Sequence, residues 1–564
     1  RGHRGLEDSN NDMLSTSDIK LYRGREHLLG DIVGSSPVYI KEPVMQFADT
    51  GYATFQNDKK TRDGMIYVGA NDGMLHAFDA TTGQERWAFI PTAVMPYLYK
   101  LADKAYDTKH HFYVDGHITV SDVDVDDSAN ADWRTVLVGT LGKGGRAAYA
   151  IDVTNPSSPT LLWEFSATAE GTTSTSTFDA DLGFTFGNVS MAKLNGNEWV
   201  ALMASGYNNV APTGTVPASP VPPAIVGRAR LYVLDPDTGT KKAEIIAASA
   251  ASGSDPRLTG MAWNNGWTEV GMSDASVRHV YAGDLSGQIW RFDLVNETAT
   301  LLTTVGQVNG VTNIQPVTVR LELGRHHDSK YDRVIYAGTG RYLGFSDVSN
   351  TDLQSLYAIR DGDGVHAPLK SNVGGPFVRS SSGAVPWVTG NRVSGMTYNN
   401  VVNSADGWYM DFDAQPGERI TVMPRLYEPD SDQWLTVVTN VPVSDVCDIG
   451  GCSYLYYLNN YSSTTGGAVH VQLVTNALAM GTAAAFLPNG QQVVLVTGSD
   501  GSVVTMRPPR LPGGSTPRLP ALGGPSRRPA RRPAPAAVGR RERSSRGSRR
   551  PRDGRSRPDR GSGT

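Results

Sequence analysis

One pattern recurs along the chain: an apolar strand, a turn that contains glycine, a second strand that ends in aspartate, and another turn. Residues 66–83 contain the clearest copy, in which Asn71-Asp72-Gly73 joins the two strands. Asp-Gly favours a tight hairpin because glycine supplies the positive φ that matches the strand twist. Six copies are marked by a glycine that follows an apolar strand, namely Gly69, Gly139, Gly206, Gly283, Gly338 and Gly498.

A repeated strand unit that cannot bury its faces alone has to stack against its neighbours, which favours an all-β fold of the β-propeller type. The long interval between Gly338 and Gly498 leaves room for two or three units. We therefore predict about seven blades, within a range of six to eight, with long inserted loops. We expect residues 31–33 to form an N-terminal strand that pairs into the last blade and closes the ring. Residues 95–105 are a candidate helix, inserted between strands.

Charge is divided unevenly along the 564 residues. Residues 507–564 contain 17 Arg and 11 Pro against three acidic residues, so they carry +14 and residues 1–506 carry −18 of the net −4. Such a segment buries too little apolar surface to offset its ordering entropy, and we predict a disordered tail. The alternatives are a polybasic arm that binds phosphates or anionic lipid, and a frameshift, because an Arg/Pro/Gly/Ala/Ser vocabulary is typical of a GC-rich gene read out of frame.

The remaining chain is predicted to contain a propeller at residues 30–506, preceded by an N-terminal extension at residues 1–29. A hydrophobic share of 39% and ten Trp suffice for a sizeable core. No stretch approaches the ~18 apolar residues of a membrane helix. The chain begins at Arg1 without an export signal, which predicts a mature or truncated form.

Three segments resemble the C-terminal domain of the PilY/PilC family: GDIVGSSPVY (residues 30–39), YVGANDGMLHAF (67–78) and YAGDLSGQIWRFDL (281–294). The repeat is similar to that of pyrroloquinoline-quinone propellers. The resemblance covers residues 30–506 and implies a non-enzymatic type IV pilus biogenesis and tip adhesion protein, which regulates pilus extension against retraction. It also implies export to the outer membrane, cell surface and pilus tip, and an N-terminal half absent from this chain. The implied partners are minor pilins or other tip components, and a host or abiotic surface bound through propeller loops.

The resemblance also implies a calcium loop of the Asp-x-Asp-x-Asp-Gly type shortly before residue 281. Calcium requires about six to eight oxygen ligands. In residues 270–279 only Asp274 matches a ligand position, and Arg278 stands where a carboxylate is expected. This favours a loop that has lost the metal, with calcium binding as the alternative. A second acidic run, at residues 122–127, is predicted to be the solvent-facing side of a strand, where alternate residues share one face.

Cys447 and Cys452 are separated by four residues, two of them glycine. In an exported protein this spacing favours a disulfide, whereas a cytosolic protein would keep two thiols or a metal pair. One alternative function is a quinone-dependent periplasmic dehydrogenase, since related enzymes use the same propeller. Those enzymes place two adjacent cysteines on the quinone, so we expect no quinone here.

Polyanion binding through the basic tail is a second alternative, although nucleic acid is not an expected partner of a body that carries −18. Esterase, phosphate-loop and zinc-protease motifs are absent, which predicts no catalytic residue. His110 and His111 are expected in a surface loop. Trp87, Trp163 and Trp290 are expected to pack between blades.

Overall fold

The computed structural model describes residues 7–8, 22–25, 27–45, 47–126, 131–167, 176–194, 198–207, 229–247, 258–263, 276–308, 311–312, 315–326, 329–343, 347–361, 396–397, 407–412, 415–427, 434–442, 451–459, 468–475, 477–486 and 492–506. Close contacts group Arg1–Gly524 as one compact unit and Pro525–Thr564 as a second. The second unit, and the whole predicted tail at residues 507–564, lie outside the described residues.

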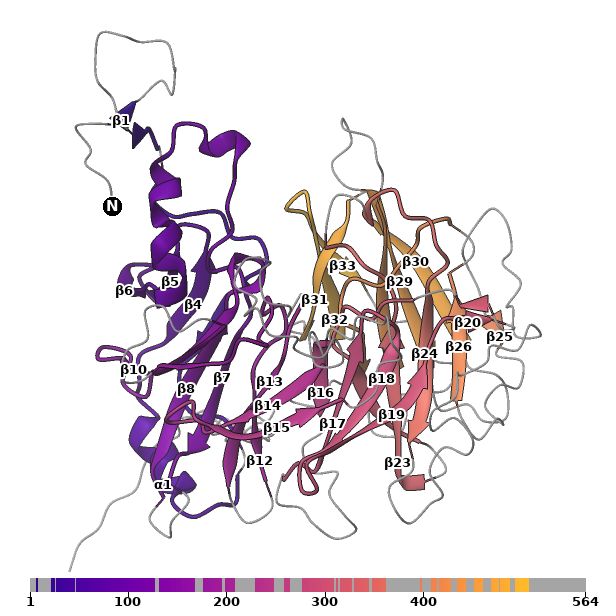
Figure 1. The fold of residues 1–564 in the computed structure, drawn as a ribbon, viewed down its shortest axis with the longest axis horizontal. Helices are drawn as coiled ribbons and strands as arrows, with labels where there is room; N and C mark the ends of the chain where they lie inside the picture. Colours follow the sequence, from indigo (N-terminus) through magenta and orange to yellow (C-terminus); the bar gives the residue numbers. More distant parts are fainter. Residues whose placement is uncertain are drawn as a thin grey trace, which may run out of the picture. The chain divides into compact units, whose positions relative to one another are not determined.

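The described strands form seven large sheets that follow one another in chain order (Figure 1). The first sheet contains β3 (Val38–Ile40), β4 (Met65–Ala70), β5 (Met74–Asp79) and β6 (Glu85–Phe89). The second contains β7 (Ile118–Asp124), β8 (Trp133–Thr140), β9 (Ala147–Asp152), β10 (Thr160–Ser166) and β11 (Ser176–Phe178). The third contains β12 (Ser190–Lys193), β13 (Trp199–Ala204), β14 (Arg230–Leu234) and β15 (Lys241–Ile246). The fourth contains β16 (Leu258–Trp263), β17 (His279–Asp284), β18 (Gln288–Asp293) and β19 (Thr298–Thr304).

The last three sheets continue this order, except that β25 joins the sixth sheet although the later β26 belongs to the fifth. The fifth contains β22 (Glu322–His326), β23 (Ser329–Gly338), β24 (Ser355–Asp361) and β26 (Gly407–Asp411). The sixth contains β27 (Arg425–Tyr427), β28 (Trp434–Pro442), β29 (Gly451–Asn459), β30 (Ala468–Thr475) and, beside β30, the earlier β25 (Met396–Thr397). The seventh contains β31 (Ala479–Phe486), β32 (Gln492–Gly498) and β33 (Val503–Met506). The prediction of an all-β propeller of about seven blades is thereby confirmed.

Few elements lie outside these sheets. Two short pairs are formed by β1 (Glu7–Asp8) with β2 (Tyr22–Arg23) and by β20 (Gln307–Val308) with β21 (Val311–Thr312). Among the described residues, the helices are α1 (Tyr52–Lys59) and the 3-10 helices η2 (Thr92–Ala102), η3 (Tyr106–Thr108) and η4 (Gly142–Gly144). The candidate helix at residues 95–105 corresponds to η2, inserted between the first two sheets. None of the helices among the described residues is long and apolar enough to cross a membrane.

The predicted closure of the ring by residues 31–33 is wrong. These residues form no strand, and the N-terminal strand β3 pairs antiparallel with β4 in the first sheet, with Val38 opposite Tyr67. The described part of the seventh sheet contains only β31, β32 and β33. The physical reason is that the polar groups of residues 30–35 bond to turns of the first two blades, so this segment is not available as a sheet edge.

A buried apolar cluster lies between each pair of sheets that are consecutive in the chain. Leu137 on β8 belongs to the cluster shared with the first sheet, whereas Val136 and Val138 belong to the cluster shared with the third. Because alternate side chains point to opposite faces and both faces are covered, the strands read as continuous apolar runs. This explains why the repeat is visible in the sequence.

The three tryptophans lie at these interfaces, as predicted. Trp163 is fully buried, and its Nε1–H donates to the carbonyl of Pro236 in the next blade at 3.0 Å. Trp87 donates in the same way to Pro156 at 2.9 Å. Trp290 is buried between the third and fourth sheets. Each side chain therefore joins neighbouring blades, two of them through a hydrogen bond as well as by packing.

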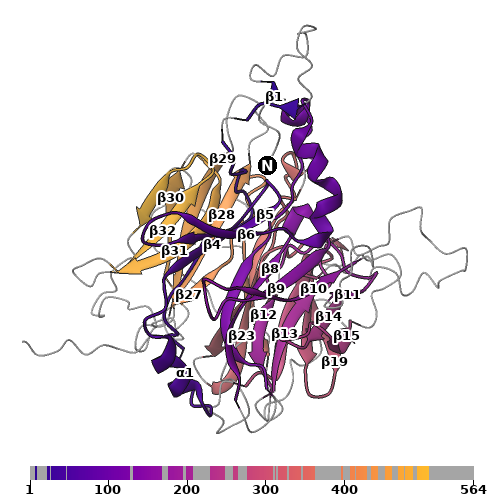
Figure 2. The ribbon, with the colours of Figure 1, turned by 90° about the vertical axis from the view of Figure 1, so that its left-hand side faces the viewer.

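The acidic run at residues 122–126 is not the exposed face that was predicted. Asp122 on β7 is only 5% exposed and accepts hydrogen bonds from the hydroxyls of Tyr52 at 2.8 Å and Thr135 at 2.6 Å. Arg62 donates to the same Thr135 hydroxyl. Tyr52 is the first residue of helix α1, which lies at the lower left in Figure 2, and its hydroxyl satisfies the buried carboxylate of Asp122.

Candidate functional site

The β4–β5 hairpin turn forms one wall of the candidate site. Gly73 has φ +92° and its N–H donates to the carbonyl of Ala70, which closes the predicted Asn-Asp-Gly turn. The Asp72 carboxylate then accepts the N–H of Met74 within the turn and the N–H of Gly30 from a distant segment, at 3.2 and 3.1 Å. The turn therefore has a second partner outside its own blade.

His76 supports this wall from behind. Its ring nitrogens lie 3.0 Å from Glu85 Oε1 and 3.1 Å from both oxygens of Asp72, and its side chain is 3% exposed. Burial alone would lower the pKa of His76, but the hydrogen bonds and charges of Asp72 and Glu85 outweigh it and raise the pKa. The ring thus holds Asp72 in place between the hairpin and Gly30.

Residues 30–35, here called the N-terminal strap, cross the ends of the first two blades. Asn71 donates its N–H to the carbonyl of Asp31 and its Nδ2–H to the Asp31 carboxylate, both at 2.9 Å. Gly34 donates to Asp115 at 2.7 Å, and Ser35 accepts the N–H of Gly69 at 3.0 Å. The strap is therefore bonded along its length to the β4–β5 hairpin and to the loop before β7.

Two glycines allow the strap to approach this closely. A Cβ atom on Gly30 would lie 2.2 Å from the backbone nitrogen of Asp72, and one on Gly34 would lie 2.4 Å from the carbonyl oxygen of Asp115. Because both neighbours are backbone atoms, no rotamer change can relieve the clash. The Gly-x-x-x-Gly spacing in GDIVGS is thus explained by backbone contact.

The opposite wall is formed by η2, η3 and the residues after them. The guanidinium of Arg23 lies over the ring of Tyr106 at 4.1 Å and within 3.3 Å of Asp107. His110 Nε2 lies 3.0 and 3.1 Å from the two oxygens of Asp31, which connects this wall to the strap. His110 is partly exposed, as predicted, but it belongs to the site rather than to an isolated surface loop.

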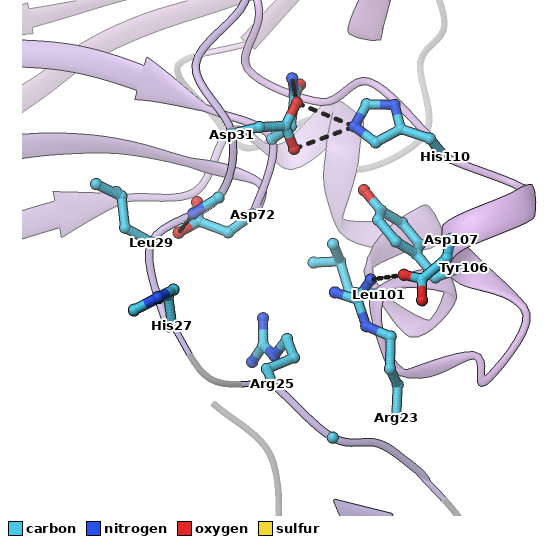
Figure 3. A pocket seen from close by; sticks show the side chains of 13 residues that line it. Arg23, Arg25, His27, Leu29, Asp31, Asp72, Leu101, Tyr106, Asp107 and His110 are labelled. Atoms are coloured by element: carbon cyan, nitrogen blue, oxygen red, sulfur yellow. Dashed lines mark hydrogen bonds and ion pairs between the residues drawn. The ribbon is translucent and has the colours of Figure 1, made fainter. Parts of the chain in front are cut away.

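Between these walls lies a cavity of about 480 Å³, here called the strap cavity (Figure 3). Its volume falls within the range of about 300–1,000 Å³ that is typical of ligand-binding clefts. It is lined by Arg23, Gly24, Arg25, His27, Leu29, Gly30, Asp31, Asn71, Asp72, Leu101, Tyr106, Asp107 and His110.

Exposed apolar side chains gather around the same segment. Leu28, Leu29, Ile32 and Val33 are 43%, 44%, 41% and 48% exposed. Helix η2 exposes Met95, Tyr97 and Tyr99, and Leu101 of the same helix lines the strap cavity. Clusters of exposed apolar side chains beside polar groups are typical of interaction sites.

A second cavity, of about 200 Å³, lies near the fifth and sixth sheets and includes Arg341, Asp347 and Arg419. Arg419 donates to the carbonyls of Asp347 and Gly417, and also to that of Asn350. Arg341 pairs with Asp347 at 2.8 Å. Since these charges are used to hold residues 341–343 and 347–350, we assign this cavity a structural role.

The residues predicted as sites from the sequence fall elsewhere. Asp274 and Cys447 lie outside the described residues, so the calcium loop and the disulfide stay predictions. Cys452 lies half-buried on β29, with Sγ 3.8 Å from the Tyr454 hydroxyl. Within the described ranges, no group of three or more His, Cys, Asp or Glu side chains could hold a metal ion.

The sequence contained one signal for the strap cavity that was used only for the family resemblance. GDIVGSSPVY and YVGANDGMLHAF meet each other in the structure, through Gly30, Asp31 and Ser35 on one side and Gly69, Asn71 and Asp72 on the other. Arg23 and Arg25 were missed altogether, because they lie before these motifs in the predicted N-terminal extension.

Seven consecutive sheets of mainly antiparallel strands, with apolar interfaces between them, define a seven-bladed β-propeller. Residues 29–301 match the family described as the PilY1 beta-propeller domain. Residues 29–301 of this chain therefore carry the propeller domain of that family.

Curated relatives extend the match beyond those residues. A type IV pilus biogenesis factor PilY1 homolog of Xylella fastidiosa (strain Temecula1 / ATCC 700964) is 30% identical over 86% of this chain and 38% of its own length. Type IV pilus biogenesis factor PilY1 of Pseudomonas aeruginosa (strain PAK) is 30% identical over 83% of this chain and 40% of its own length. The chain therefore spans less than half the length of these relatives.

Among solved structures, the Pseudomonas aeruginosa PilY1 C-terminal domain superposes with a TM-score of 0.59. The match covers 84% of this chain and all of that domain, at 23% identity. At this identity the match supports the fold alone.

Proposed function

We propose that this chain is the propeller portion of a type IV pilus biogenesis factor, and that it acts through protein contacts rather than catalysis. The observation that carries the proposal is 30% identity, across most of the chain, to relatives named for that function. The strap cavity and its exposed apolar surroundings supply a contact surface of the kind that such a role requires. A rigid propeller suits the role because it presents loops without changing shape itself.

In this proposal the partners are pilus components, such as minor pilins or other tip proteins. The place of action is the cell surface, at the outer membrane and the pilus tip. There the chain favours pilus extension over retraction, and its loops bind a host or abiotic surface. The relatives' names support the pilus association, whereas the tip location and the adhesion come from the sequence resemblance.

The proposal includes neither quinone nor calcium. Cys447 and Cys452 are separated rather than adjacent, and the loop at residues 270–279 keeps one matching carboxylate, Asp274. Calorimetry of the purified chain tests the calcium part. We expect the same unfolding temperature in calcium and in chelator, and a rise with calcium would contradict this part.

A chimera tests the pilus function. This chain replaces the matching C-terminal portion of PilY1 in Pseudomonas aeruginosa, and surface pilin and twitching zones are compared with those of a strain that lacks the portion. We expect the chimera to restore both, with equal secretion of the protein shown by immunoblot. A secreted chimera that restores neither would contradict the proposed function.

A further inference from the structure

The strap cavity contains a guanidinium group without a partner. Arg25 is half-buried, lines the cavity, and forms no hydrogen bond or ion pair with any residue that the structure describes. In Figure 3 its guanidinium points into the open space between His27, Asp72 and Tyr106. On neighbouring Arg23, the Nε–H is buried and has no acceptor within the described part of the chain. The guanidinium of Arg25 therefore supplies unpaired N–H donors on the wall of the cavity.

The carboxylates of the cavity are already occupied. Asp31 accepts from His110 and from Asn71, and Asp107 pairs with Arg23. Asp72 accepts from the backbone N–H groups of Gly30 and Met74 and lies beside His76. A half-buried cation without a counter-ion is costly, so the charge of Arg25 favours an anion from outside the described structure.

Carboxylate fits this position better than phosphate. A guanidinium group binds a carboxylate through two parallel hydrogen bonds, and one such group balances one carboxylate charge. Asp31, Asp72 and Asp107 line the same cavity, and their charges repel a doubly charged phosphate more strongly than a singly charged carboxylate.

The surroundings indicate that the carboxylate belongs to a peptide segment. Leu29 both lines the cavity and is 44% exposed, and Leu28, Ile32 and Val33 beside it are exposed to a similar degree. A free acid would leave these side chains in water, whereas apolar residues on either side of an acidic residue would cover them.

We propose that the strap cavity binds an Asp or Glu side chain of a partner protein. Its carboxylate pairs with Arg25, and the apolar residues that flank it pack on Leu28, Leu29, Ile32 and Val33. That this partner is a pilus component rests on the proposed function, whereas the recognition of an acidic and apolar segment rests on the cavity alone.

Selection from a random displayed peptide library tests the cavity directly. The full chain, Arg25→Ala and Arg341→Ala are immobilised in parallel; Arg341 is a matched control because it lies in the second cavity. We expect peptides with Asp or Glu between apolar residues to be enriched on the full chain and on Arg341→Ala, and lost on Arg25→Ala. Because Arg25 has no partner within the described ranges, its variant should unfold at the same temperature as the parent chain.

The selected peptide is then measured by fluorescence anisotropy. Replacing its acidic residue with the amide should weaken binding about tenfold or more, as loss of a charged hydrogen-bonded pair does. Selection without acidic enrichment, or enrichment that survives Arg25→Ala, would overturn the proposal. Displacement by inorganic phosphate at lower concentrations than by acetate would also overturn it, by showing a phosphate site.

The chimera separates this proposal from the pilus function. If Arg25→Ala abolishes peptide binding and also reduces surface pilin, both proposals are supported. If it abolishes peptide binding while piliation and twitching stay normal, the carboxylate site is supported and its pilus partner is refuted.

Discussion

The first and fourth blades contain the same hairpin and use it in opposite ways. In β4–β5 and in β17–β18 a tyrosine, a glycine and a turn glycine recur at the same spacing, and Gly73 and Gly287 both have positive φ. In the first blade the turn aspartate is Asp72, three residues after the strand glycine Gly69, where it lines the strap cavity. In the fourth blade it is Asp284, directly after the strand glycine Gly283, where it is 0% exposed and accepts a hydrogen bond from the indole N–H of Trp290 at 3.1 Å.

The position of one carboxylate therefore decides whether a repeated turn forms a cavity wall or a buried anchor. His76 in the first blade stands where Trp290 stands in the fourth. The ring of His76 and the N–H of Gly30 hold Asp72 at the cavity wall, whereas an indole donor and backbone N–H groups enclose Asp284. Conserved backbone geometry thus leaves the function of each copy to two side chains.

The largest expected effect is the pH dependence caused by Asp284. Burial raises its pKa to about 7, and hydrogen bonds from Gln288, Trp290 and Ser286 offset this only in part. Between pH 3.8 and 7 the unfolded chain releases this proton and the folded chain keeps it, so the free energy of unfolding falls as pH rises. At about 1.4 kcal/mol per pH unit, the loss reaches about 4 kcal/mol above pH 7.

Urea unfolding between pH 4 and 8 measures this loss. We expect Asp284→Asn to remove this fall in the free energy of unfolding with pH. The difference in free energy of unfolding between the variant and the parent chain should therefore change steadily from pH 4 to pH 7. Asp293→Asn is the control, because hydrogen bonds and the charge of Arg278 outweigh burial there and lower the pKa to about 2. The free-energy penalty of Asp293→Asn should be constant above about pH 4 and should shrink only below it, outside the window measured here. Parallel curves for Asp284→Asn and the parent chain would contradict the prediction.

The two turn glycines should also respond differently to alanine. Both have positive φ, which costs a residue with a Cβ about 1–2 kcal/mol. A Cβ on Gly287 would lie 2.9 Å from the carbonyl oxygens of Gln315 and Val305, whereas one on Gly73 would meet the flexible end of Leu98. We expect Gly287→Ala to cost about 3 kcal/mol and Gly73→Ala about 1–2 kcal/mol, measured by urea unfolding. Equal costs would show that backbone contact does not distinguish the two turns.

A third effect belongs to the first blade alone. His76→Ala removes hydrogen bonds to Asp72 and Glu85, and we expect it to cost about 2 kcal/mol at pH 6. Because the folded pKa is raised, the stabilisation is present below pH 6.5 and is lost as pH rises through the folded pKa. The penalty for His76→Ala should therefore shrink at high pH. A penalty that is independent of pH would indicate packing rather than charge.

The repeat made most of this fold predictable, because both faces of each blade are buried and the apolar strands and turn glycines follow from that burial. Other features depended on contacts between distant residues. Residues 31–33 looked like a strand, but hydrogen bonds to Asn71 and Asp115 turned this segment into a strap. Asp122 looked exposed because its partner Tyr52 lies 70 residues away. The cavity was missed for the same reason, since Arg25 and His110 line it together although they lie 85 residues apart in the sequence.

The smallest expected effect concerns the turn that follows each hairpin. Asp79 accepts the N–H groups of residues 81 and 82, and Asp293 accepts those of residues 295 and 296, so the two turns share one geometry. Four residues after this aspartate, the first blade has Gly83, with φ +70° and nothing within 4 Å of an added Cβ atom. The fourth blade has Glu297 at the equivalent place, with φ +51°.

Exchange of these residues isolates the conformational cost of a side chain at positive φ. Glu297→Gly should stabilise the chain by about 1 kcal/mol, and Gly83→Ala should destabilise it by about the same amount. Urea unfolding at pH 7 measures both changes. Because neither position is crowded, opposite and similar shifts would show that the two turns differ only in backbone preference. A destabilised Glu297→Gly would instead show that the glutamate contributes a contact that offsets its conformation.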